Sequence, residues 1–262
     1  MKIILSITIA FLISCSSKPK QKLVAVKSKP DPKLIRALLD SGFQEDCDTA
    51  IAIYTTVIML DSNNAEAYWR RGDELYRTRK YNEALIDLNR SLEVDSNFSY
   101  SQVISDRGQA KDMLLYYQEA ISDFTKAINV ALTKNSTIPQ GLEKYYYNRA
   151  NSKLKLGDTA YALIDLDSAI YFWSSHHFAI KRRAQVNTAL GKYTEAMKDY
   201  KLLIQQNGDF PDDEEWSADF YYRGIAKKRT GDKTYKKDFK KAEKYKYYHG
   251  KRIYVKGIID CS

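Results

Sequence analysis

The chain has few of the residues from which catalytic and metal-binding sites are usually built. It holds only three cysteines and three histidines among 262 residues. Two of the histidines, His176 and His177, are adjacent, so their side chains point apart and lack a third ligand at the spacing of a zinc site. The sequence also contains no Gly-rich phosphate loop and no nucleophile elbow. We therefore expect a protein that is not an enzyme and that holds no metal and no cofactor.

The apolar run at the start of the chain is short. It covers residues 3–14, or 12 residues, whereas a helix that spans a bilayer needs roughly 20. One early lysine, a short apolar segment and a small residue before the break are typical of an export signal. The run ends in Leu12-Ile13-Ser14-Cys15, which resembles the lipobox of bacterial lipoproteins. An ordinary signal peptide or a short anchor with an incidental cysteine is the alternative.

The lipobox resemblance implies a lipid-anchored protein of the bacterial cell envelope. Residues 1–14 would be removed as a signal peptide, and Cys15 would become the first residue and carry the lipid that holds the chain at a membrane. Residues 15–30 are rich in Ser, Lys and Pro, which indicates a flexible tether. Because Ser16, and not an aspartate, follows the cysteine, the sorting of well-studied lipoproteins favours the outer membrane.

A pattern of small and large residues recurs along the rest of the chain. In residues 65–97, small side chains stand at positions 8, 20 and 27 and large ones at positions 4, 17 and 24, where they would let two helices approach and fill the space between them. These are Gly72, Ala84 and Ser91, and Tyr68, Tyr81 and Leu88. The pattern returns from residues 101, 143, 177 and about 216, and in a degenerate form from residue 31.

This spacing is similar to that of the tetratricopeptide repeat (TPR), a 34-residue helix–turn–helix unit. The resemblance implies an all-α fold, a right-handed α-solenoid of about six repeats over residues 31–246. Residues 247–262 are expected to form a basic tail or cap. A disulfide needs Cα atoms within about 7 Å, so Cys47 and Cys261 at opposite ends of such a stack should not be bridged. We expect Cys47 to pack as a small apolar residue.

An arginine at position 7 and an aspartate at position 23 occur together in five repeats. Both positions are usually apolar in the TPR family and face each other, and both are apolar in the degenerate first repeat. Two positions that change type together indicate a direct contact better than they indicate five ligand sites. We therefore predict partly buried structural ion pairs that fix the helix register. The pairs are Arg71/Asp87, Arg107/Asp123, Arg149/Asp165, Arg183/Asp199 and Arg223/Asp238.

The TPR resemblance places partner binding on a concave face built from the first helices, at positions 2, 5, 6, 9, 12 and 13. Aromatic residues and arginines are common anchors of interfaces, and asparagine amides can hold a peptide backbone. The candidates are Trp69, Arg70, Tyr147, Asn148, Asn151, Phe178, Lys181 and Arg182. The Lys and Asn pattern of carboxylate-clamp TPR proteins is not reproduced. The alternative is that these are ordinary exposed residues of amphipathic helices.

Positive charge is concentrated near the end of the chain. The net charge is +9, and residues 226–256 hold 13 basic and 3 acidic residues interleaved with tyrosines. In a cytosolic protein this would suggest nucleic acid. In an exported lipoprotein it favours an anionic lipid, a glycan or an acidic partner and no nucleic acid. A solvated face with a frayed tail is the alternative.

Together these features predict a lipid-anchored TPR scaffold that binds a protein or peptide partner in the envelope. The layout of lipobox, tether and short repeat stack looks like that of lipoproteins that assist outer-membrane assembly, pilus assembly or the control of wall hydrolases. The alternative function is a surface-binding module that uses the basic end to hold an anionic glycan or lipid.

Overall fold

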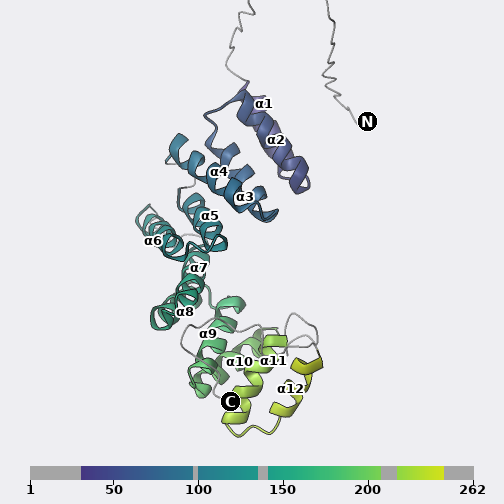
Figure 1. Ribbon diagram of the computed structural model, residues 1–262, viewed down its shortest axis with the longest axis vertical. Helices are drawn as coiled ribbons and strands as arrows, with labels where there is room; N and C mark the ends of the chain where they lie inside the picture. Colours follow the sequence, from purple (N-terminus) through teal and green to yellow (C-terminus); the bar gives the residue numbers. More distant parts are fainter. Residues whose placement is uncertain (1–30, 97–99, 135–140, 208–216, 245–262) are drawn as a thin grey trace, which may run out of the picture.

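The computed structural model describes residues 31–96, 100–134, 141–207 and 217–244. The described residues form helices and no strands, arranged as an elongated stack (Figure 1). Cys15, the tether at residues 15–30 and the basic tail at residues 247–262 lie outside them. The helices are α1 (Pro32–Gly42), α2 (Cys47–Leu60), α3 (Ala65–Arg77), α4 (Tyr81–Val94), α5 (Tyr100–Met113), α6 (Tyr117–Lys134), α7 (Leu142–Lys155), α8 (Thr159–Phe172), α9 (His177–Ala189), α10 (Tyr193–Asn207), α11 (Ser217–Arg229) and α12 (Tyr235–Lys244).

Each helix packs against its neighbours in the sequence, so that α1 to α12 form consecutive antiparallel pairs. The odd-numbered helix of each pair is the first helix of its repeat, and successive first helices α3, α5 and α7 also touch one another, as α9 and α11 do. The predicted all-α solenoid of TPR type is confirmed. Within the described ranges, no helix has the length and apolar character needed to cross a membrane.

Polar side chains set the helix starts. The Asp31 carboxylate accepts a hydrogen bond from the amide of Lys33, and Pro32 occupies the first helical turn of α1. At the start of α3, the side-chain oxygen of Asn64 accepts from the amide of Ala67 at 2.9 Å. Such caps satisfy amides that have no partner inside the helix.

The turn between the two helices of a repeat needs a left-handed residue at position 15. Gly157, Gly191 and Gly231 take this place with φ of 82°, 75° and 84°. Arg79 and Leu115 occupy the same position with φ of 63° and 68°. The left-handed backbone conformation costs these two residues about 1 kcal/mol or more, whereas glycine adopts it without this strain.

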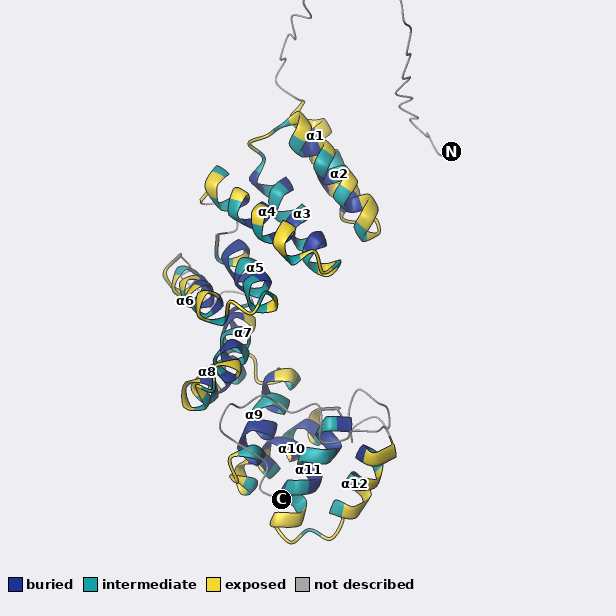
Figure 2. Ribbon diagram, viewed as in Figure 1, coloured by how far each residue is buried: buried dark blue, intermediate teal, exposed yellow. Residues whose placement is uncertain are grey.

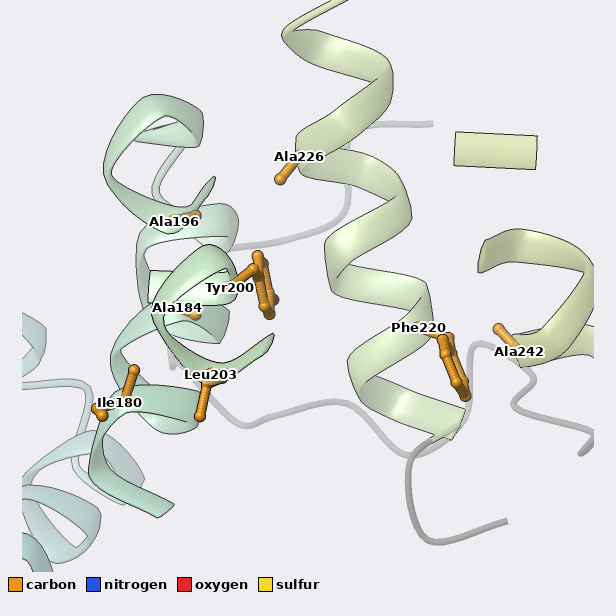
Figure 3. Close-up of a cluster of buried hydrophobic side chains, with 8 residues drawn as sticks. All are labelled: Ile180, Ala184, Ala196, Tyr200, Leu203, Phe220, Ala226 and Ala242. Carbon is orange, nitrogen blue, oxygen red and sulfur yellow. The ribbon is translucent and has the colours of Figure 1, made fainter. Parts of the chain in front are cut away.

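The core lies between the two helices of each pair and between successive pairs, where buried residues face inward (Figure 2). Small residues permit the close approach: a Cβ added at Gly108 would lie 2.9 Å from Cε1 of Phe124. In the last cluster, Tyr200 of α10 points toward α11, and Phe220 of α11 faces Ala242 of α12 (Figure 3). All three are almost fully buried.

The last repeat differs from the others in its turn. Five residues separate the end of α11 at Arg229 from the start of its second helix, α12, at Tyr235, and α12 is only 10 residues long. Thr234 donates its amide to the Asp232 carboxylate at 2.8 Å within this turn. Asp238 lies in the first turn of α12, where its carboxylate accepts hydrogen bonds from Arg223 of α11.

Candidate functional site

The five arginine–aspartate pairs are present, and all five have the same bidentate form. In each pair Nε donates to one carboxylate oxygen and a terminal nitrogen donates to the other, the strongest geometry for this type of contact. For Arg149 and Asp165 the two distances are 2.9 and 2.7 Å. The other pairs span 2.6–3.0 Å: Arg71/Asp87, Arg107/Asp123, Arg183/Asp199 and Arg223/Asp238. All five aspartates are buried, so these charges hold each helix pair together and are not available to a ligand.

The remaining terminal nitrogen of four of these arginines reaches the preceding repeat. Nη1 of Arg149 donates to the hydroxyl of Thr125 on α6 at 3.0 Å. The acceptors all stand at position 25 of the preceding repeat, on its second helix. The other three contacts are Arg71 to Thr55 at 3.1 Å, Arg107 to Asn89 at 3.0 Å and Arg183 to Asp167 at 2.6 Å. One guanidinium thus joins three helices.

Three of the buried aspartates have a second cation. Lys153 Nζ lies 2.8 Å from Asp165, one helical turn beyond the arginine. Lys111 makes the same contact with Asp123 at 2.7 Å, and Lys227 with Asp238 at 2.9 Å. The sequence carries the signal for this second cation as a lysine at position 11 of those repeats, four residues after the arginine at position 7.

The residues at positions 2, 5, 6, 9, 12 and 13 of α3, α5, α7, α9 and α11 form what we call the first-helix face. Neighbouring first helices are joined across it by side chains. Ser152 of α7 donates to the Asp112 carboxylate of α5 at 2.7 Å, and Lys155 pairs with the same carboxylate. On α9, Gln185 donates to Asp219 of α11 at 2.7 Å. Part of this face is therefore used to hold the stack together.

Three of the residues predicted to bind a partner are engaged in such contacts. Trp69 Nε1 donates to Asp106 at 2.8 Å. Arg70 donates to the carbonyl of Leu39 at 3.2 Å in the preceding repeat, and Lys181 lies 2.8 Å from Asp219. These side chains are less available to a ligand than their positions suggested.

The other predicted residues are more accessible. The side-chain amides of Asn148 and Asn151 have no hydrogen-bond partner among the described residues, and both are half-buried on α7. Arg182 has only a long contact to Gln185 at 3.5 Å. Phe178 is 47% exposed. Their role in binding remains a prediction.

Tyr147 lies in an aromatic cluster at the junction of the fourth and fifth repeats. Its ring centroid is 5.2 Å from that of His176, and Trp173 is at the same distance from this histidine. His176 is buried and caps α9, because its Nδ1 accepts from the amide of Ala179 at 3.3 Å. Burial lowers the pKa of His176, so the ring is neutral at physiological pH and is able to accept this bond.

Asp106 of α5 is the most electrostatically perturbed carboxylate on the first-helix face. Besides Trp69, the amides of Gln102 and Gln109 donate to it, both at 3.0 Å. Burial raises the pKa of Asp106 to about 7; the three hydrogen bonds oppose this shift, and the charge of Asp73 adds to it. Asp73 of α3 makes no hydrogen bond and no ion pair with another described residue, and burial raises its pKa as well.

Metal and thiol chemistry have little support in the described part of the chain. It contains no group of three or more His, Cys, Asp or Glu residues that could hold a metal ion. Cys47, the first residue of α2, is a free and half-buried thiol. A hydrogen bond with the Glu74 carboxylate raises the pKa of Cys47, which leaves the unreactive thiol form dominant.

Stacked helix pairs joined by short turns define a helical-repeat protein. The family model of the tetratricopeptide repeat matches residues 65–98, which contain α3 and α4. The chain therefore contains a tetratricopeptide repeat at residues 65–98, and its described helices have the fold of a tetratricopeptide-repeat solenoid.

Three known proteins are similar to this chain. A DnaJ homolog subfamily C member 7 homolog of Schizosaccharomyces pombe is 28% identical over 173 residues, which cover 62% of this chain but only 36% of that relative. The structure of PilF of Pseudomonas aeruginosa aligns with a TM-score of 0.67 at 15% identity, over 85% of this chain and 95% of that one. PilW, a widely conserved type IV pilus biogenesis factor, gives 0.65 at 15% identity, over 82% and 91%. At such identities the two structures show the fold alone.

Proposed function

We propose that this protein is a non-enzymatic scaffold, anchored by a lipid on Cys15 in a bacterial cell envelope, that binds a protein or peptide partner along its first-helix face. The observation that carries the proposal is the contrast between two sets of polar residues. The charges at positions 7 and 23 pair with each other inside the repeats, whereas the side-chain amides of Asn148 and Asn151 have no hydrogen-bond partner within the described ranges. Side-chain amides that have no partner within the described residues are suited to bind a peptide main chain, and an exposed phenylalanine on the same face is suited to contact an apolar side chain.

Site-specific photocrosslinking in intact cells tests the binding face. A photoreactive amino acid at position 151 should give one dominant crosslinked protein. The same amino acid in place of Tyr171, which is 80% exposed on α8, serves as the control and should not give that product. A product of equal yield from both positions would contradict binding by the first-helix face.

Metabolic labelling tests the anchor independently. The lipobox supports lipid attachment at Cys15, so a palmitate analogue should label the chain and the protein should sediment with membranes. Cys15→Ser should remove the label and release the protein. Labelling that persists in this variant would refute lipidation at this residue and leave the binding proposal standing.

A second candidate function concerns the basic end of the stack. Exposed lysines on and before α12 have no acidic partner among the described residues: Lys233, Lys236, Lys237 and Lys240. Such a surface attracts anionic headgroups or glycans. Vesicles of phosphatidylglycerol should bind the Cys15→Ser protein at low salt, and changing the four lysines to glutamine should abolish that binding. Equal binding to phosphatidylcholine vesicles would rule out an electrostatic surface.

A further inference from the structure

Two carboxylates on the first-helix face make no ion pair within the described residues, unlike the buried aspartates elsewhere; the charge of Arg77, which pairs with Glu74, offsets the raised pKa of Asp73 only in part. Each buried aspartate has an arginine or lysine nitrogen within 2.8 Å: Asp87, Asp123, Asp165, Asp199, Asp219 and Asp238. Asp106, by contrast, accepts only from the neutral groups of Trp69, Gln102 and Gln109. Asp73 has no hydrogen-bond or ion-pair partner in the described chain.

The two carboxylates belong to one local surface. Asp73 stands at position 9 of α3 and Asp106 at position 6 of α5, the adjacent first helices that Trp69 joins. Burial is the main cause of the raised pKa of Asp106, and the negative charge of Asp73 adds to it. Burial raises the pKa of Tyr76 on α3, and the neighbouring Tyr81, Asp112, Asp106 and Asp73 add smaller contributions. The result is a half-buried anionic spot with indole and phenol groups beside it.

An anionic spot of this kind destabilises the free protein. Two like charges removed from water cost free energy unless a cation compensates them. The pairs elsewhere in the stack show that the sequence supplies internal cations where a carboxylate serves the fold. Carboxylates that are perturbed without an internal partner are candidates for contact with an external one.

The chemistry of the spot favours a single organic cation over a metal ion. Two carboxylates offer fewer oxygen ligands than the six to eight that calcium takes, and no third acidic or His side chain completes a metal-binding group in the described residues. An ammonium or guanidinium group needs only one or two carboxylates. The aromatic rings beside the two carboxylates also favour the binding of an organic cation.

The same face continues onto α7, where Asn148 and Asn151 stand at the register positions of Asp106 and Asp73. Their amides are without partners in the described chain. Packed helices lie about 8–10 Å apart, a distance that about three residues of an extended chain span. One short peptide can therefore reach both the carboxylates and the amides.

We propose that the first-helix face of α3, α5 and α7 docks an extended peptide that carries a lysine or arginine. The cationic group lies between Asp73 and Asp106, and Asn148 and Asn151 bind the peptide main chain about three residues away. This inference rests on the proposed function, to which it adds the chemistry of the partner.

Fluorescence anisotropy with defined peptide pools tests it on the full chain. Each pool consists of short labelled peptides with a central residue fixed as lysine, arginine, norleucine or glutamate and randomised flanks. Norleucine matches the lysine stem without the charge. The lysine and arginine pools should bind at least about tenfold more tightly than the norleucine pool, or about 1.4 kcal/mol, and the glutamate pool should bind most weakly.

Two variants with equal charge change separate the site from general electrostatics. The Asp73→Asn/Asp106→Asn variant should lose the preference for cations and still bind the norleucine pool. The control Glu119→Gln/Glu195→Gln, which changes two exposed residues on second helices, should keep the preference. Circular dichroism checks that both variants are folded. The Asn148→Ala/Asn151→Ala variant should weaken all pools by a similar factor.

The outcomes distinguish this inference from the function on which it rests. Equal binding of the lysine and norleucine pools, or equal loss of preference in the control, would overturn the cationic partner and leave peptide binding intact. If no pool binds the unaltered protein, peptide binding itself is wrong.

Discussion

The five arginine–aspartate pairs share a geometry but differ in their second cation, and this difference makes a sharp prediction. Asp165 contacts both Arg149 and Lys153. Asp87 contacts Arg71 alone, because Leu75 stands where the lysine would be. We compare Arg71→Met with Arg149→Met, since methionine keeps much of the apolar stem and removes only the charge and its hydrogen bonds.

The expected magnitudes follow from burial. The side chain of Asp87 is 5% exposed, and loss of Arg71 leaves a buried carboxylate without a cation, at a cost of about 3–5 kcal/mol. The Asp165 side chain is 2% exposed but retains Lys153. Arg149→Met should therefore cost only about 1–2 kcal/mol, the value of its lost hydrogen bonds. Each arginine also loses one threonine contact, so that term is matched between the two variants.

A double variant isolates the effect of the lysine. Lys153→Met alone leaves Asp165 with its bidentate arginine and should cost less than about 1 kcal/mol. Combined with Arg149→Met it should remove the last cation and bring the total to about 3–5 kcal/mol. The combined cost should exceed the sum of the single costs by more than about 1 kcal/mol, because the two cations share one carboxylate.

Native-state hydrogen exchange with mass spectrometry suits this test, because the stability of a repeat stack varies along its length. Peptides from α3 and α4 report on Arg71→Met, and peptides from α7 and α8 report on the other variants. The control is Arg90→Met, which removes an exposed pair with Glu93 and should leave stability almost unchanged, because water screens such pairs. Equal losses for Arg71→Met and Arg149→Met, or additive losses in the double variant, would refute the claim that these aspartates need a compensating cation.

Three further predictions concern single residues. Asp106→Asn should stabilise the protein by about 1–3 kcal/mol at pH 8. The folded-state pKa of Asp106, about 7, lies above the ordinary value, so the free energy of unfolding falls as pH rises from about 4 to 7. Urea titrations across that range should show this slope in the unaltered protein and not in the variant. The pKa of His176 is lowered, so its stabilising contribution is complete above about pH 6.5 and is lost as pH falls below that value. His176→Asn keeps a capping oxygen for the Ala179 amide and should reduce this loss of stability at acidic pH in the same titrations. Gly224→Ala places a Cβ 2.5 Å from Cε1 of Phe239 and should lower stability by about 1–3 kcal/mol; an unchanged melting temperature would mean that the ring moves freely.

The features that repeat at a constant interval could be predicted from the sequence. Gly108 meets Phe124 within one repeat, and Arg149 meets Asp165 within one repeat, where the turn between helices keeps the spacing at 16 residues. A periodic pattern therefore identifies both the fold and the ion pairs. The same reasoning applies to the left-handed turn position, although Leu115 shows that glycine is not required there.

The contacts between repeats could not be predicted in this way. Arg71 reaches Thr55 across 16 residues, whereas Arg149 reaches Thr125 across 24, because the connections between repeats differ in length. The acceptors share position 25 of the preceding repeat, but the number of residues between donor and acceptor is not constant. For the same reason the sequence did not show that Arg70 contacts the preceding repeat. Position on the first-helix face identifies candidate residues, but only the packing of neighbouring repeats shows which of them are already paired.

The structural charges and the proposed binding site are connected through the geometry of the stack. A buried ion pair adds little net stability compared with a well-packed apolar pair, so stability alone does not explain five of them. Each bidentate contact has one orientation, and in four repeats the third nitrogen also fixes the preceding helix pair. Arg107 and Arg149 lie on α5 and α7, the helices that carry Asp106 and Asn148. Their contacts therefore set the distance between the Asp106 carboxylate and the Asn148 side-chain amide. An extended peptide that binds both groups must match this distance.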